Sequence, residues 1–209
     1  MLPQVALDGL FIALGYLSGS LPMGVLVARF TGARDPRTVG SGRTGGTNAL
    51  RAMGAWRAAL VATLDVLKGF GPVLFAALAG ASALGVALTG VAAVVGAARS
   101  IFLHFHGGRG VATGIGATLW IAPLAIPLGL PFFLVPIWLT RLVSLGSLIG
   151  TAMGSAIIGL FVVLGWDPWP YFLFAVLGTA VVWFAHRDNI DRLLRGEERK
   201  FDPIARGDG

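Results

Sequence analysis

A polar, glycine-rich stretch joins two long apolar segments, and its residue types suit it to binding phosphate. Residues 40–51 read Gly-Ser-Gly-Arg-Thr-Gly-Gly-Thr-Asn-Ala-Leu-Arg. Glycines let a backbone turn tightly and bring N–H groups close to a ligand, and arginine offers a planar fork that fits phosphate oxygens. The glycines lead into a helix-forming run, and a helix N-terminus favours anions. The expected ligand contacts are Ser41, Gly42, Gly45, Thr47, Asn48 and Arg51.

This stretch also has a plainer interpretation, as a flexible linker whose arginines lie near lipid headgroups. No Lys-Ser/Thr pair follows the glycines, so it is not a Walker A loop. Glycine-rich matches are weak signals by themselves, and the rest of the chain must decide between the two interpretations.

A second glycine-rich stretch repeats the same chemistry. Gly107, Gly108 and Gly110 surround Arg109, and an apolar, helix-forming run follows. We therefore expect this loop to bind an anion as well. His104 and His106 precede it, but no carboxylate lies nearby and the chain has no cysteine. A metal site needs more ligands than these, so we expect no metal and no cofactor.

Two oppositely charged residues, Asp65 and Lys68, lie inside an apolar segment. Ionisable groups within a membrane are costly, and by default they are paired or functional. A spacing of three residues puts both on one helix face, so they can neutralise each other. Lys68 is alternatively a contact for a bound anion, and the sequence leaves both interpretations open.

Two further polar clusters each adjoin an apolar segment. Arg141, Ser144 and Ser147 form the first, in which Ser144 has the alternative role of a helix cap. The second begins at His186 and includes Asn189. A single histidine at such a position is usually structural, but here it is one of several groups that suit an anion.

The composition identifies the class of protein that must position these clusters. Of 209 residues, 56% are hydrophobic and only 12% are charged, whereas soluble domains carry about 25% charged residues. Long uncharged runs indicate an all-α integral membrane protein. The absence of cysteine excludes disulfides and thiolate nucleophiles, and the distribution of the +6 net charge argues for membrane topology and against nucleic acid.

We predict about seven transmembrane helices, because a span needs about 20 apolar residues. Prolines divide the stretch 111–140 into two short spans or a broken hairpin, and a Ser-Leu-Pro break interrupts the first span. The other spans are expected at 58–79, 82–103, 145–164 and 171–185, and the first at 10–30. We expect one domain over residues 1–209, with residues 186–209 as an amphipathic tail on the membrane surface that is helical from His186 to Lys200.

The cations lie on one side of this topology. All 16 Lys and Arg fall in the odd-numbered connections, in the tail, or in segments that border them, and the opposite connections have none. The positive-inside rule places the odd connections and the C-terminus in the cytoplasm, with the N-terminus outside. All of the polar clusters then share one face, as a site for a multiply charged anion requires.

In order and spacing, these motifs together resemble the bacterial acyl-phosphate:glycerol-3-phosphate acyltransferases, which are seven-span inner-membrane enzymes. The resemblance covers nearly the whole chain. It rests on the motifs at 40–51, 65–69, 107–113 and 141–147 and on the third family motif, His186 to Glu198. It implies a multi-pass protein of the bacterial inner membrane, with its active site on the cytoplasmic side. We expect a monomer that binds no nucleic acid.

Two residues depart from the family pattern. The second motif usually opens with Gly-His and contains Gly-Gly-Lys, but here Ala97 follows Gly96 and Arg109 replaces the lysine. Arginine keeps the charge but binds phosphate as a fork. Alanine cannot supply an imidazole. A divergent member that uses another acyl donor, such as a thioester, is therefore an open alternative.

The resemblance implies transfer of a fatty acyl group from acyl phosphate to the 1-hydroxyl of glycerol-3-phosphate, the first acylation of phospholipid synthesis. The implied catalytic residues are His186, Asn189, Ser41, Arg51 and Arg109. The implied substrate contacts are Gly42, Gly45, Thr47, Asn48, Lys68, Gly107, Gly108, Ser144, Ser147, Arg192 and Glu197.

A transporter or anion channel is the competing class, because broken helices and glycine loops also occur in transporters. Such a protein should carry polar groups toward both membrane faces and internal repeats. The sequence shows neither, since the outward half is almost wholly apolar and the motif loops do not repeat one another.

Overall fold

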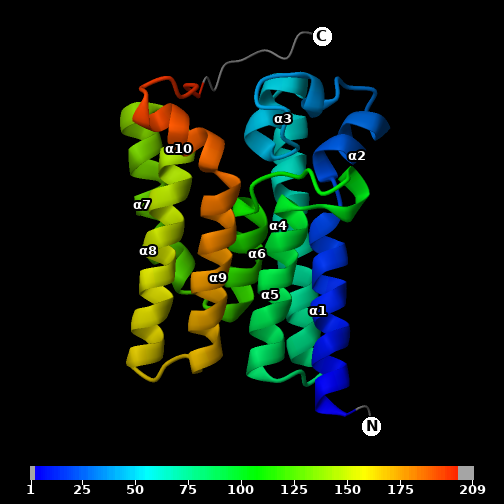
Figure 1. The fold of residues 1–209 in the computed structure, drawn as a ribbon, viewed down its shortest axis with the longest axis vertical. Helices are drawn as coiled ribbons and strands as arrows, with labels where there is room; N and C mark the ends of the chain where they lie inside the picture. Colours follow the sequence, from blue (N-terminus) through cyan, green and yellow to red (C-terminus); the bar gives the residue numbers. More distant parts are fainter. Residues whose placement is uncertain (1–2, 202–209) are drawn as a thin grey trace.

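The computed structural model describes residues 3–201, which form a bundle of helices (Figure 1). The membrane-length elements run between two ends of the bundle, and the short helices gather at one of them, here called the site end. The elements are α1 (Gln4–Ser20), α2 (Met23–Phe30), α3 (Gly46–Met53), α4 (Ala55–Leu78), α5 (Ala83–Ala98), α6 (Val111–Ile121), α7 (Ala125–Thr140), α8 (Val143–Val163), α9 (Trp169–Ala185) and α10 (Arg187–Leu194), with 3₁₀ turns at Pro36–Thr38 and Ile101–Leu103.

Among residues 3–201, three helical segments are long and apolar enough to cross a membrane, namely Ala55–Leu78, Ala83–Leu103 and Val143–Val163. The number rises to five if each of two bent pairs counts as one span, α1 with α2 and α9 with α10. Helices α6 and α7 are apolar but shorter. The expected broken hairpin at 111–140 is therefore two short helices, and seven spans remain a prediction.

The expected break in the first span is confirmed, because α1 and α2 meet at an angle of 48°. Pro22 immediately precedes α2, where its missing N–H does no harm. Helix α4 holds the bend from the side: Lys68 Nζ donates to the carbonyl of Leu21 at 3.0 Å, and Ser18 Oγ donates to the carbonyl of Lys68 at 2.9 Å. The bend turns α2 toward α3 at the site end.

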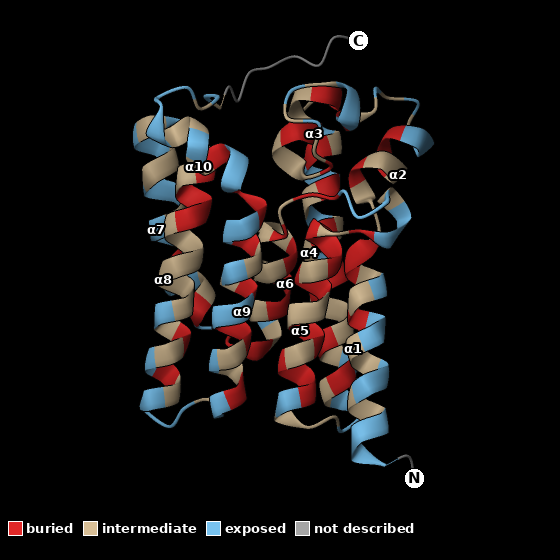
Figure 2. Cartoon of the chain, in the orientation of Figure 1, coloured by how far each residue is buried: buried red, intermediate tan, exposed pale blue. Residues whose placement is uncertain are grey.

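Close glycine contacts join the helices of the core. A side chain at Gly116 of α6 would overlap the Val66 carbonyl of α4, and one at Gly69 of α4 would overlap the Thr113 carbonyl of α6. Such crossings let two backbones approach closely, which is how helices associate in lipid. Figure 2 shows buried residues along the inside of the bundle and exposed residues on its periphery. The α4–α6 contact fixes the position of α6, and the second glycine loop directly precedes its first turn.

The tail helix is shorter than the sequence suggested. We expected an amphipathic helix from His186 to Lys200, but α10 ends at Leu194. Gly196 adopts a φ of +72°, which favours glycine and ends the helix. The chain then turns back toward the bundle, and Phe201 N donates to the carbonyl of Arg141 at 2.6 Å. Residues 202–209 of the predicted tail lie outside the described residues.

Candidate active site

A cavity of about 800 Å³ occupies the site end, and segments far apart in the sequence form its walls. It collects polar residues from the first loop, α3, α4, the second loop, α8, α10 and the chain beyond α10. Most of the residues singled out in the sequence line it: Ser41, Gly45, Thr47, Asn48, Arg51, Lys68, Gly108, Arg109, Ser144, Ser147, His186 and Asn189.

Asn48 holds the first glycine loop together. Its Nδ2 lies 2.6 Å from the Pro36 carbonyl, 3.1 Å from that of Val39 and 2.9 Å from that of Arg43. Its Oδ1 accepts from Ser41 N at 3.1 Å. The side chain is buried, and these bonds use both of its N–H hydrogens and one of the two lone pairs of Oδ1. Asn48 therefore shapes the loop from within, although it was expected to contact the ligand.

Two helix N-termini meet at the cavity. Helix α3 begins just after Gly45, and α6 begins just after Gly110, which has a φ of +79°. The loops before them touch: a Cβ added at Gly108 would lie 3.6 Å from Thr44 Oγ1 and 3.9 Å from Gly45 N. The first N–H groups of a helix have no partner within it, and its positive end attracts anions. The sequence predicted two anion loops, and the structure places them side by side.

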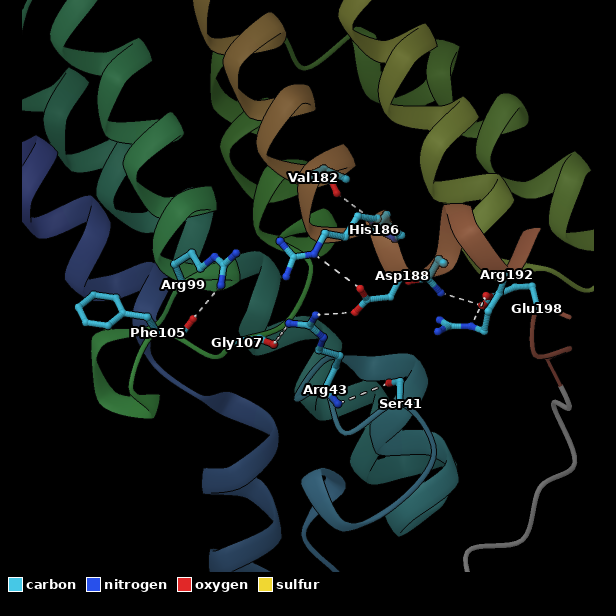
Figure 3. Close-up of polar contacts among 12 residues, drawn as sticks. Ser41, Arg43, Arg99, Phe105, Gly107, Val182, His186, Asp188, Arg192 and Glu198 are labelled. Carbon is cyan, nitrogen blue, oxygen red and sulfur yellow. Dashed lines mark hydrogen bonds and ion pairs between the residues drawn. The ribbon is translucent and has the colours of Figure 1, made fainter. Parts of the chain in front are cut away.

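Arg43 connects three parts of the site (Figure 3). Its Nη1 donates to the Gly107 carbonyl at 3.3 Å, and its Nη2 lies 3.4 Å from Asp188 Oδ2 on α10. The first loop is thereby tied to the second loop and to the last helix. Arg43 belongs to the polar stretch but was not among the expected ligand contacts, because no local pattern shows that its partners lie 64 and 145 residues away.

The cations of the site crowd one another. The pKa of Arg109 is lowered to about 10, chiefly by burial and also by the nearby charges of Arg43, Arg192 and Arg51, while Glu198 opposes the shift. Arg109 stays charged at neutral pH. Like charges held together in a buried cavity repel one another unless an anion enters, so the arrangement favours a ligand with several negative charges.

His186 is buried, with only 1% of its surface exposed. Its Nδ1 lies 2.8 Å from the Val182 carbonyl. Because a carbonyl can only accept, Nδ1 carries the proton and Nε2 keeps its lone pair. Burial lowers the pKa of His186 to about 4, the neighbouring arginines contribute, and the Val182 bond and Glu198 oppose the shift. The imidazole is neutral at pH 7 and is able to accept a proton.

Three buried polar atoms of the cavity lack a hydrogen-bond partner among residues 3–201. They are Arg109 Nε, Ser144 Oγ and Asn189 Oδ1. Buried polar atoms in native proteins nearly always have partners, so atoms without one mark the place of a ligand or water. The set offers one charged donor, one hydroxyl and one amide acceptor, which suits a ligand that bears both phosphate and hydroxyl groups.

The intramembrane ion pair forms as the sequence allowed. Lys68 Nζ lies 2.7 Å from Asp65 Oδ1, and both side chains are nearly buried. Lys68 also donates to the Leu21 carbonyl, so two of its three N–H groups have partners. Both residues line the cavity. The geometry favours a bracing role, and Lys68 retains one N–H for a ligand.

Four expected contacts do not line the cavity, namely Gly42, Gly107, Arg192 and Glu197. Gly42 has a φ of +67° and shapes the loop. Gly107 accepts from Arg43. Glu197 is exposed and pairs with Arg195 at 3.4 Å. Its neighbour Glu198 lines the cavity instead, and Arg192 pairs with this carboxylate at 2.9 Å. Sequence reasoning missed Glu198, because only the turn at Gly196 shows which of the two glutamates points inward.

The cavity opens sideways along α4. Ala55, Ala59, Thr63 and Leu67 line it and are also exposed on the bundle surface. Their spacing of four residues makes them one stripe along the helix. This stripe connects the cavity with the outer surface of the bundle.

A second, apolar cavity of about 140 Å³ lies between α6, α7, α8 and α9. Val111, Ile115 and Phe133 line both cavities, so the two adjoin. Glycines line much of this cavity and leave its volume unfilled, and a Cβ added at Gly154 would have no atom within 4 Å. The polar cavity therefore has apolar space on two sides.

The donor set gives no indication of a metal centre. Within the described part of the chain, no three His, Asp or Glu side chains group as metal ligands would. His104 and His106 are exposed and do not line the cavity. His104 has a φ of +51°, so the chain is not extended there.

Comparison with known proteins gives consistent matches. Residues 9–196 match the family model described as glycerol-3-phosphate acyltransferase. A protein of that name from Rubrobacter xylanophilus is 42% identical over 97% of this chain and all of its own length. One from Anaeromyxobacter dehalogenans is 44% identical over 93% of this chain and 97% of its own.

Two crystal structures of the integral membrane glycerol 3-phosphate acyltransferase PlsY (YgiH) are also similar. The glycerol 3-phosphate form has a TM-score of 0.85 and 34% identity, covering 94% of this chain and 96% of that one. The lysophosphatidic acid form has a TM-score of 0.82 and 32% identity, covering 95% and 97%.

Proposed function

Because the chain belongs to the glycerol-3-phosphate acyltransferase family, we infer that it is a membrane enzyme that acylates glycerol-3-phosphate to lysophosphatidic acid, with acyl phosphate as the donor. The acceptor and the product are those that appear in the PlsY structures. The observation that carries the proposal for this chain is the cavity itself, which joins a crowded set of cations to apolar space that opens sideways.

Both substrates of this reaction carry phosphate, and they must be held within reacting distance. The converging N-termini of α3 and α6 and the cations Arg51 and Arg109 would offset the repulsion between the two anions. Ser41 and Thr47 add hydroxyl donors on the first loop. Ser144 adds one at the first turn of α8, a third helix N-terminus at the cavity.

The chemistry needs no protein nucleophile. The 1-hydroxyl of glycerol-3-phosphate attacks the acyl carbon, a new C–O ester bond forms, and the bond from that carbon to the phosphate oxygen breaks. Phosphate leaves with the bonding electrons. The proton of the attacking hydroxyl passes to His186 Nε2, which the Val182 contact leaves free to accept. Arg109 would stabilise the negative charge that develops on the acyl oxygen.

The fatty acyl chain would lie along the exposed stripe of α4 and reach toward the second cavity past Phe133. Cytoplasmic placement of the site end follows from the charge pattern, because the cations lie on this side of the topology. In a bacterium we expect the protein in the inner membrane, with water-soluble glycerol-3-phosphate arriving from the cytoplasm and the donor arriving from the leaflet. We expect a monomer.

The decisive experiment is a donor-by-acceptor screen on the purified protein in detergent. Acyl phosphate with labelled glycerol-3-phosphate should yield labelled lysophosphatidic acid, whereas acyl thioester should not. Transfer from the thioester alone would replace the proposed donor. His186→Ala should lower turnover strongly, and unchanged turnover would remove His186 as the base. Flux of labelled glycerol-3-phosphate into liposomes without any acylation would instead indicate a transporter.

A further inference from the structure

Glu198 places a carboxylate against the α10 face that borders the cavity. Its Oε1 accepts from Asn189 Nδ2 at 2.7 Å, and its Oε2 accepts from Arg192 Nε at 2.9 Å (Figure 3). The two donors are three residues apart on α10, so one carboxylate bridges both. Its side chain is only 7% exposed.

The end of α10 explains how Glu198 reaches this place. Glu197 N donates to the Arg192 carbonyl at 2.8 Å, and Gly196 N donates to the Leu193 carbonyl at 3.1 Å. These two bonds, with Gly196 in the left-handed region, form a Schellman motif, which ends a helix and reverses the chain. The residue after the reversal returns to the helix that it has just left, so Glu198 faces Asn189.

The bond to Glu198 decides which way the Asn189 amide points. A carboxylate accepts but cannot donate, so the nitrogen of the amide must face it and the oxygen must face away. Asn189 Oδ1 is buried at the cavity wall and has no partner among residues 3–201. The amide therefore presents an acceptor to the cavity, held there by a charge-assisted bond.

We propose that Glu198 is a positioning residue, which fixes Asn189 so that its carbonyl oxygen accepts a hydrogen bond from a hydroxyl of the acceptor substrate. The inference rests on the proposed function and deepens it. A phosphate dianion offers only acceptors, and would find no donor in Asn189 Oδ1. A glycerol hydroxyl does supply one. The acceptor thus lies with its glycerol end toward α10 and its phosphate toward the arginines and the α3 and α6 N-termini.

Glu198→Gln tests this without removing volume. The glutamine keeps its oxygen on Arg192 and turns its NH₂ group toward residue 189, which forces the Asn189 amide to rotate and to present NH₂ to the cavity. An unsatisfied buried donor or acceptor costs about tenfold or more in affinity. We expect kcat/KM for glycerol-3-phosphate to fall about tenfold or more, while inhibition by n-propyl phosphate, which has the phosphate but no hydroxyl, stays unchanged.

A reciprocal exchange provides the rescue. In Asn189→Asp two carboxylates face each other, and activity should fall. In the double variant Asn189→Asp with Glu198→Gln, the glutamine donates to one oxygen of the new carboxylate at position 189, and the other oxygen again faces the cavity as an acceptor. The double variant should be more active than either single variant, a non-additivity that a purely structural role would not produce. Asp191→Asn, which removes an exposed carboxylate from the same helix, is the matched control and should behave as wild type.

The outcomes separate this inference from the proposed function. Two outcomes would overturn the positioning role alone. In the first, the wild-type protein is active and Glu198→Gln is equally active. In the second, the double variant is no more active than the poorer single variant. If Glu198→Gln fails to fold, comparing the activity of the double variant with that of Asn189→Asp still tests the positioning role. The thermal midpoint of each variant is measured in parallel. A wild-type protein that transfers no acyl group from acyl phosphate would instead overturn the function.

Discussion

Replacing Asn48 tests whether the first loop is shaped from within or by its ligand. Asn48→Asp keeps the shape of the side chain and its bond from Ser41 N, but it removes both N–H hydrogens. Three backbone carbonyls, those of Pro36, Val39 and Arg43, share those two hydrogens in the structure. In the variant a carboxylate oxygen faces all three carbonyls at close range.

The two lost hydrogens give the magnitude. A net contribution of about 1 kcal/mol for each bond gives about 2 kcal/mol, or about 30-fold in the population of the ordered loop. Repulsion between the carboxylate and the carbonyls adds to this, so Asn48→Asp should be worse than Asn48→Ala. Residues after Asn48 belong to the hydrophobic cluster of α2, α3 and α4, and the bundle itself should remain folded.

Steady-state kinetics with limited trypsin digestion would measure both effects. We expect kcat/KM for glycerol-3-phosphate to fall at least 30-fold in Asn48→Asp, and cleavage after Arg43 to become faster. Arg37→Gln is the control, since it breaks only an exposed ion pair with Asp35, a contact of little energetic value. Wild-type kinetics in Asn48→Asp would refute the internal role. Reduced activity with an equally protected loop would instead favour direct contact between Asn48 and the substrate.

Three further predictions address the rest of the site. The pKa of His186 is lowered to about 4, so the imidazole should still be neutral at pH 5.5, where an ordinary histidine would be about nine-tenths protonated. We therefore expect kcat at saturating substrate to be nearly flat from pH 7.5 to 5.5. The thermal midpoint should decline as the pH falls from about 6.5 to 4, because the unfolded chain binds the proton more readily. A tenfold fall in kcat over that range would contradict it. Gly154→Leu should fill the second cavity and shift the donor preference to shorter acyl chains, with the preference changing about fourfold for each methylene that no longer fits. Gly71→Leu, at a position that also has open space but lines neither cavity, should not shift it. Equal chain-length profiles for the two variants would exclude the second cavity as the binding place of the acyl chain. Gly116→Ala should lower the thermal midpoint, because its methyl group would overlap the Val66 carbonyl, and Gly71→Ala serves as the comparison; equal midpoints would show that α4 and α6 adjust freely.

The sequence predicted the polar motifs of the site but not their internal hydrogen bonding. Glycines followed by helix-forming residues correctly indicated helix N-termini at Gly46 and Val111, since this signal is local. The internal bonds of Asn48 were not predicted, because its four partners are loop backbone atoms whose positions depend on the folded loop. Arg43 was not selected as a site residue because its partners lie on the second loop and on α10, which meet it only in the folded chain. Glu198 was not selected because only the turn at Gly196 directs it back toward Asn189.

The spans show the same division between local and long-range information. Apolar length and proline positions indicated where α4, α8 and α9 lie and where the first span breaks. They did not indicate that α10 would stop at Leu194, since the predicted amphipathic pattern continues beyond it. The left-handed conformation of Gly196 ends the helix and turns Glu198 back toward it, although the amphipathic pattern continues.

The exposed stripe of Ala55, Ala59, Thr63 and Leu67 changes how concentration should be counted for this enzyme. A donor that enters from the leaflet is sampled by its mole fraction among the surrounding amphiphiles, not by its amount per litre. Adding inert detergent or lipid at constant donor and protein should therefore slow the reaction by dilution within the surface. Lipophilic inhibitors that enter along this stripe would be diluted in the same way, so their measured potencies can be compared only at equal amphiphile content.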